Sequence, residues 1–440
     1  MIDKIWSKYI ASQAKSTTRQ YIFLRTLALF INLLSQLLIP IIITSRLGFA
    51  AYGKWVFAIS LTGFISFLDL GLIASISTSV MTKKGHSFEV QEILLMTSLR
   101  KLILFIYVVA SMLTSTYLLL YLQSHSSASP DIHVLVSFAL LNSLALFLLR
   151  YFEASFRSAG STYGYAVCVM NSLASALTTL FFVFIKSSLV TIMFANFVIS
   201  LLFVLSFAVK KDSFSSVSTT KLNPRVGPRL KSFLPLGLTY LLFPIGYLIL
   251  NEGLNIAVSR LAGYEILGTL GLVRAISGVY RQLTSLIVNS FLPSLTLLVK
   301  ASQLRALGIR FASMKRSIYR LNAVIFIILS LTAAASSNYS SYLHSRIHVA
   351  LIFAFMSSAL MDVPWNTWLA LGLASNSYRG IAFLFPVTSL VTILICAPAF
   401  HFFGIYGIAL SLLVQDFILT KPAITNGMNI LNGERDDRFS

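Results

Sequence analysis

Uninterrupted apolar runs of about twenty residues recur along the whole chain, and they limit its fold more than any other feature. In lipid, only helices and closed barrels satisfy all of their backbone hydrogen bonds. The runs are continuously apolar and do not alternate with a period of two, which excludes barrel strands. The sequence therefore predicts an all-α polytopic membrane protein of about twelve transmembrane helices, near residues 22–44, 55–80, 102–122, 132–152, 163–185, 189–209, 233–257, 266–292, 320–338, 348–371, 381–400 and 404–422.

The composition agrees with a membrane environment. The chain is 57% apolar and 11% charged, whereas about a quarter of the residues of a soluble protein are charged. A net charge of +20 would suggest nucleic acid in a soluble protein, but these cations punctuate apolar runs and form no aromatic-interleaved face. We expect no nucleic-acid partner.

The distribution of lysine and arginine predicts the orientation. With the N-terminus inside, the predicted outer loops hold only Arg46, Lys54, Lys186, Arg260 and Arg346. The other loop cations gather on the inner side, as the positive-inside bias requires. Both termini are therefore predicted to be cytoplasmic.

A long basic connection divides the chain into two predicted halves of six helices. Residues 45–47 (SRL) recur as 259–261, and the loop 159–163 is echoed at 374–378 with nearly the same spacing. Such repeats predict two parallel copies of one unit, with the substrate site between them. The predicted parts are an N-terminal segment 1–21, an N-lobe 22–209, a cytoplasmic linker 210–232, a C-lobe 233–422 and a cytoplasmic tail 423–440.

Several short motifs resemble one transporter family. They are residues 45–48 (SRLG) with 52–53 (YG), residues 69–72 (DLGL), residues 157–163 and residues 404–407 (GIYG). Together with the helix count, they resemble polysaccharide-type flippases (the Wzx type) of the multidrug/oligosaccharidyl-lipid/polysaccharide (MOP) exporter superfamily.

The resemblance implies a function in the bacterial inner membrane. Such flippases move undecaprenyl-pyrophosphate-linked oligosaccharide units outward for O-antigen or other surface polysaccharide assembly. Membrane lipids, a polysaccharide polymerase and chain-length machinery would be the partners. The resemblance also implies that helices one, two, seven and eight line a central cavity.

Few ionisable residues lie inside the predicted spans, and these are the candidate functional residues. An ionised side chain at the bilayer centre costs roughly 2.5–3.5 kcal/mol on insertion scales, so it normally faces a cavity or a partner. Arg25 is shallower and can extend toward the interface. The deep positions are Asp69, Glu252, Arg274, Arg281, Asp362 and Asp416.

Arg274 and Arg281 are the candidates for binding an anionic headgroup. Seven residues separate them, so they share one helix face about 10 Å apart. Two guanidinium groups suit a pyrophosphate because each can give paired hydrogen bonds to phosphate oxygens. We assign them, with Arg25, to the cavity; the alternative is that each arginine is neutralised by Asp69 or Glu252.

Asn251, Glu252 and Asn255 form a polar face that can bind sugar hydroxyls. An equally good alternative is that the amides join helices through interhelical hydrogen bonds. Asp69 and Glu252 are also candidates for coupling to a proton or sodium gradient. No other cofactor is expected.

Other features are assigned structural roles. Asp362 and Asp416 lie on predicted peripheral helices, where we expect structural pairing. His344 and His348 are predicted to form a surface pair and not a metal site. The basic segment 300–320 is predicted to be an amphipathic stretch that lies on anionic lipid, or a segment whose positive charge only sets the topology.

Two other function classes, an antiporter and a membrane enzyme, predict different sequence features. A cation-coupled multidrug or metabolite antiporter of the same superfamily would favour carboxylates that bind cations, whereas helix eight presents two arginines. A membrane-embedded oligosaccharide polymerase or ligase needs an outward active site, but the predicted outer loops are short and hold no acid/base pair. We therefore expect a transporter and not an enzyme.

Overall fold

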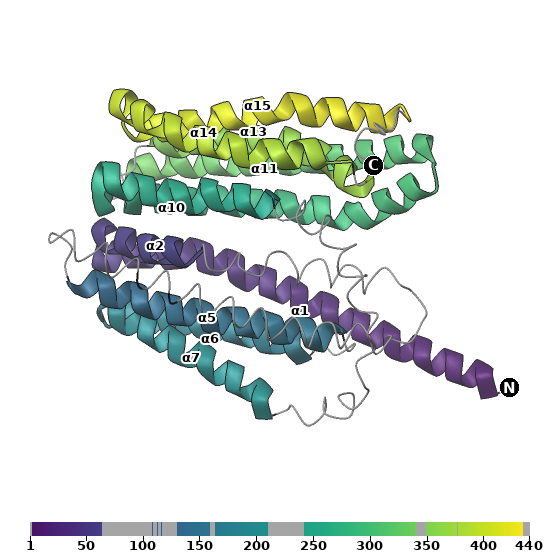
Figure 1. Cartoon of the computed structure of the whole chain (residues 1–440), viewed down its shortest axis with the longest axis horizontal. Helices are drawn as coiled ribbons and strands as arrows, with labels where there is room; N and C mark the ends of the chain where they lie inside the picture. Colours follow the sequence, from purple (N-terminus) through teal and green to yellow (C-terminus); the bar gives the residue numbers. More distant parts are fainter. Residues whose placement is uncertain are drawn as a thin grey trace. The chain divides into compact units, whose positions relative to one another are not determined.

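The computed structural model describes residues 2–63, 130–158, 163–209, 242–339, 349–375 and 377–433, with single positions at 108, 112 and 116. Regular structure in these ranges is helical, and they contain no strand. The chain divides into two compact units, residues 1–241 and 242–440 (Figure 1). Within the described part, seven segments are long and apolar enough to cross a membrane. The prediction of a multi-pass, all-helical membrane protein is confirmed.

The first unit is built from helices that pack around a small apolar core. α5 lies along α7, and α1 lies along α6. Leu149, Val167 and Phe207 are buried where α5, α6 and α7 meet. The described helices are α1 (Ile2–Leu47), α2 (Phe49–Gly63), α5 (Pro130–Ser158), α6 (Tyr163–Phe184) and α7 (Leu189–Val209).

The first helix is longer than the predicted span. α1 begins at Ile2, although the apolar run begins near residue 22, because polar residues can continue a helix beyond the membrane. It ends at Leu47, and Gly48 takes a φ of +89°, which favours glycine. α2 follows at Phe49, so most of the predicted outer loop is helical and the reversal takes a single residue.

The second unit carries the candidate functional residues. α13 lies along both α15 and α10, and α14 lies along α15. A π-helical turn, η2, interrupts the helical run that starts at residue 242. The described elements are η2 (Ile249–Gly253), α10 (Leu254–Lys300), α11 (Leu304–Tyr339), α13 (Val349–Ser375), α14 (Arg379–Phe403) and α15 (Ile405–Leu431).

Predicted helices seven and eight meet at one glycine. Gly263 has φ 80° and ψ 177°, which breaks the helical path inside α10. We call residues 242–262, which include η2, the first arm, and residues 264–300 the second arm. The two arms give a close approach between Asn251 and Arg274, which the site below depends on.

The basic segment 300–320 is not a separate surface helix. It forms the turn after α10 and the first half of α11, whose 36 residues reach about 54 Å, well beyond the roughly 30 Å of bilayer hydrocarbon. Leu307, Phe311 and Met314 are buried in a core shared with the second arm and α13. Residues 304–320 are therefore the first part of a longer helix that packs against the second arm and α13.

The outer surface of the second unit is more apolar than that of a soluble protein. Large apolar side chains on α14 and α15 are exposed, including Phe383 at 63% and Phe417 at 70%. Polar groups turn inward instead: the buried Gln415 amide donates to Ser389 Oγ at 3.0 Å. Lipid solvates the outer apolar face, so the ionisable side chains inside the unit need partners there.

Candidate functional site

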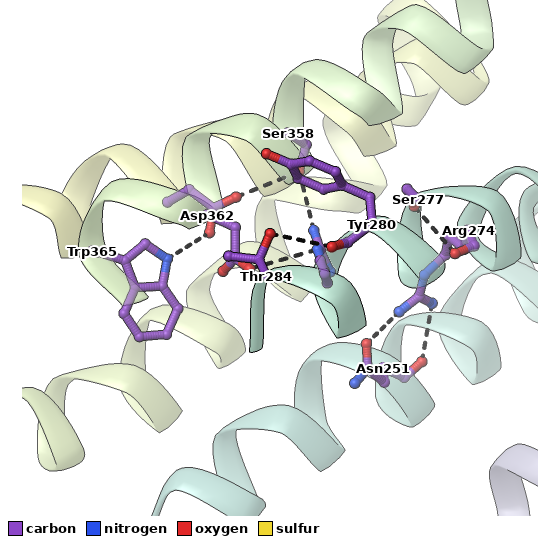
Figure 2. Close-up of polar contacts among 10 residues, drawn as sticks. Asn251, Arg274, Ser277, Tyr280, Thr284, Ser358, Asp362 and Trp365 are labelled. Atoms are coloured by element: carbon purple, nitrogen blue, oxygen red, sulfur yellow. Dashed lines mark hydrogen bonds and ion pairs between the residues drawn. The ribbon is translucent and has the colours of Figure 1, made fainter. Parts of the chain in front are cut away.

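Arg274 lies on the second arm, and its guanidinium reaches the first arm (Figure 2). Nη1 donates to Asn255 Oδ1 at 2.6 Å and to the main-chain oxygen of Asn251 at 3.2 Å. Nη2 donates to Asn251 Oδ1 at 2.5 Å. These three oxygens are uncharged, and the bonds to them fix the orientation of the guanidinium.

The partners of Arg274 lie in or next to the π-helical turn η2. A π-helical turn holds more residues than an α-helical turn, so its carbonyls leave the regular hydrogen-bond ladder. The main-chain oxygen of Asn251 accepts from the Leu254 amide and also from Arg274. On another side, a Cβ at Gly253 would lie 2.8 Å from Ile393 Cδ1 of α14, so a larger residue would require this side-chain end to shift.

Arg281 lies two turns further along the second arm and has different partners. Its Nε lies 3.8 Å from Asp362 Oδ2 on α13, and Nη2 lies 3.5 Å from the Ser358 hydroxyl, to which it donates. The side chains of Arg281 and Asp362 are 29% and 14% exposed. Arg281 is therefore part of an ion pair inside the second unit.

Asp416 of α15 extends this cluster. Its Oδ1 accepts from Trp365 Nε1 at 3.1 Å, and its Oδ2 accepts from the Ser358 hydroxyl at 3.4 Å. Ser358, Asp362 and Trp365 are spaced so that they share one face of α13. These contacts agree with the structural pairing expected for Asp362 and Asp416, and they join α10, α13 and α15.

The structure brings together only some of the predicted site residues. Asn251, Asn255 and Arg274 form one group, with the half-buried Glu252 in the same turn. Arg281 lies apart from them, against Asp362. Arg25 is on α1, and its side chain is not among those described; Asp69, His344 and His348 lie outside the described residues.

The acidic partner of Arg281 is Asp362. The sequence had suggested pairing with Asp69 or Glu252 instead. The signal was present in the spacing of Ser358, Asp362 and Trp365, which puts two polar groups and an indole on one helix face. Within the described ranges, no group of three or more histidine, cysteine, aspartate or glutamate residues can hold a metal ion.

No protein-family model matches the sequence, and no curated protein sequence matches it. Solved transporter structures do match its fold. A MATE-family multidrug resistance transporter of the MOP superfamily, in an inward-facing conformation, aligns with a TM-score of 0.71 and 11% identity over 92% of this chain and 96% of that chain.

Two further structures match over nearly the full length. The lipid II flippase MurJ, inward closed, gives a TM-score of 0.65 at 11% identity over 94% of this chain and 90% of its own. The MATE multidrug transporter DinF-BH gives a TM-score of 0.64 at 15% identity over 93% of this chain and 94% of its own. The chain therefore has the fold of MOP-superfamily transporters, and the predicted architecture of two six-helix lobes is confirmed.

Proposed function

We propose that the chain is a flippase of the bacterial inner membrane that moves undecaprenyl-pyrophosphate-linked oligosaccharide units outward by alternating access. The observation that carries the proposal is Arg274, a guanidinium held in a fixed orientation on a membrane-spanning helix by three uncharged oxygens. A cationic fork of this kind suits a phosphate oxygen pair better than an organic cation.

The chemistry of the cargo fits this group. A pyrophosphate is strongly hydrated in water, and a binding site must replace that hydration with directed donors and positive charge. The Asn251 and Asn255 amides hold the guanidinium in place before the ligand arrives. Arg274 therefore receives the headgroup, while the polyprenyl tail stays in lipid.

The case for Arg281 is weaker than the case for Arg274. Asp362 Oδ2 already lies 3.8 Å from its Nε, so a phosphate would have to compete with a carboxylate for this arginine. Arg25 completes the proposed set of cationic groups. Glu252, in η2, and Asp69 remain the proposed sites of coupling to a proton or sodium gradient.

The solved structures support a membrane transporter, and one of them supports a flippase in particular. One neighbour is a flippase named for lipid II, so the fold of this chain accommodates a flippase. The polymerase and chain-length proteins of surface polysaccharide assembly remain proposed partners.

The proposal is tested by deleting the gene and complementing it with Arg274→Ala. We expect lipid-linked oligosaccharide to accumulate on the cytoplasmic leaflet in the deletion, and the variant not to restore surface glycan although it is present in the membrane. Phe417→Ala is the control, because this side chain on α15 is exposed and is not among the residues that contact Arg274 in the site described above. Normal surface glycan with Arg274→Ala would remove Arg274 from the mechanism.

The second candidate is a cation-coupled multidrug or metabolite antiporter. It is favoured by the two MATE multidrug transporters among the structural neighbours. The same deletion separates the two: altered drug sensitivity with normal glycan identifies the antiporter. Transport measured against pH and sodium in Asp69→Asn and Glu252→Gln tests the coupling sites, and an unchanged dependence would exclude them.

A further inference from the structure

The π-helical turn η2 is confined on two sides. On one side Arg274 donates to the main-chain oxygen and to the side chain of Asn251. On another side Gly253 packs against Ile393 of α14. A π-helical turn inside an α-helix is uncommon and is frequently found at functional sites, so the groups that hold it are of interest.

The side chains of Asn251 and Asn255 both point their Oδ1 atoms at one guanidinium. An amide whose oxygen is engaged in this way is not available to accept from a sugar hydroxyl at that atom. Asn255 is 9% exposed, which places it in the interior of the unit. The two amides therefore act on Arg274 before they act on any cargo.

We propose that Arg274 holds η2 in its π-helical form, that Asn251 and Asn255 are positioning residues for Arg274, and that an anionic phosphate releases the turn by replacing their oxygens on the guanidinium. The last step rests on the proposed function; the first two do not. Each residue of an α-helix turns the chain by about 100° about the helix axis. If η2 became α-helical, the part of the first arm before the turn would therefore rotate by about this angle relative to the part after it. Headgroup capture thereby changes the shape of the first arm.

The reactivity of a cysteine on α14 can be used to detect this change. Cys396 of α14 is 0% exposed. It follows Ile393, the residue packed against Gly253, by one helical turn. The other cysteine of the chain, Cys168, lies in the first unit.

The test uses the full-length Cys168→Ser protein in nanodiscs, where Cys396 is the single thiol. The rate at which a small methanethiosulfonate reagent modifies Cys396 is measured with geranylgeranyl pyrophosphate, and with geranylgeraniol as the headgroup-free control. We expect the pyrophosphate to raise the modification rate about tenfold, which corresponds to the free energy of about one lost hydrogen bond to a charged group. The alcohol should leave the rate unchanged.

Variants separate the holding role from ligand contact. In Arg274→Gln we expect a high rate without ligand and no further response to pyrophosphate. Arg274→Lys keeps the charge but not the planar guanidinium, so Cys396 should also be modified faster in this variant. It provides a second test if Arg274→Gln does not fold. In Asn255→Ala the pyrophosphate should act at a concentration equal to or lower than in the parent, because a competitor for the guanidinium is gone.

Phe417→Ala, at an exposed side chain of α15, is the control for a substitution outside η2 and its contacts, and its rate should equal that of the parent. If both Arg274 variants keep the parent rate, the inference is overturned, whatever the protein transports. If Asn255→Ala weakens pyrophosphate binding, the amide is a ligand contact and its positioning role is overturned. If the Arg274 variants expose Cys396 but the parent binds no pyrophosphate, the holding role stands and the proposed headgroup function fails.

Discussion

The second arm of α10 presents one arginine to the first arm and another to α13, and the two are held by different chemistry. Arg274 donates to three uncharged oxygens of Asn251 and Asn255. Arg281 lies beside Asp362, in a cluster that also holds Asp416. The observed partners of Arg274 are thus amide and main-chain oxygens, whereas the partner of Arg281 is a carboxylate. We therefore expect the two arginines to respond differently to substitution.

The largest effect on stability is expected at Arg281. Arg281→Met leaves Asp362 and Asp416 inside the unit without this cation, and breaking a buried ion pair on one side costs about 3 kcal/mol or more. We expect a marked fall in Tm in detergent, measured by thermal unfolding. The double variant Arg281→Met with Asp362→Asn removes both charges and should recover most of the loss. A double variant as unstable as the single one would contradict the ion pair.

The opposite behaviour is expected at Arg274. Arg274→Gln leaves neutral amides behind, and lost hydrogen bonds of that kind cost about 1–2 kcal/mol. Transport of the pyrophosphate-linked cargo should fall about 100-fold, because a directed charged contact is lost. The measurement is flux in proteoliposomes beside Tm for the same preparation. A fall in Tm as large as that of Arg281→Met, with flux retained per folded protein, would reverse the comparison.

A smaller effect is expected where the cluster meets α15. Trp365→Phe removes the indole N–H that donates to Asp416 Oδ1, and an unsatisfied acceptor of this kind costs about 1–2 kcal/mol. Trp368→Phe is the matched control on the same helix, where the indole packs against Phe311 in a tilted arrangement with ring centroids 4.8 Å apart. Thermal unfolding should show Trp365→Phe as the more destabilising of the two. Equal losses would mean that ring size, and not the hydrogen bond, decides the effect.

The two arginine environments also show what the sequence could predict. The apolar runs predicted the spans, and the scarcity of embedded charge drew attention to Arg274 and Arg281. Their spacing predicted one helix face with the two side chains about 10 Å apart, and in the structure they meet different partners. The pairing with Asp362 depends on how α13 packs against α10, which no local pattern encodes.

The π-helical turn was also beyond sequence reasoning. Asn251, Glu252 and Gly253 carry no residue pattern specific to a widened turn, and the apolar run around them reads as a regular span. The turn depends on tertiary contacts with Arg274 and Ile393. Local propensity therefore predicted the helix, and packing determined its irregular turn.

The smallest effect tests that packing contact. In Gly253→Ala the new Cβ meets Ile393 Cδ1, the far end of a flexible side chain, so the cost of about 1 kcal/mol for overpacking is partly offset by the better helix propensity of alanine. We expect a net loss of about 0.5 kcal/mol by thermal unfolding. Ile393→Val removes the Cδ1 atom, so the double variant Gly253→Ala with Ile393→Val should be more stable than Gly253→Ala alone. If Ile393→Val lowers the stability of Gly253→Ala further, η2 does not pack against α14 at this point. The difference between the surroundings of Arg274 and Arg281 would then depend on the contacts of Arg274 alone.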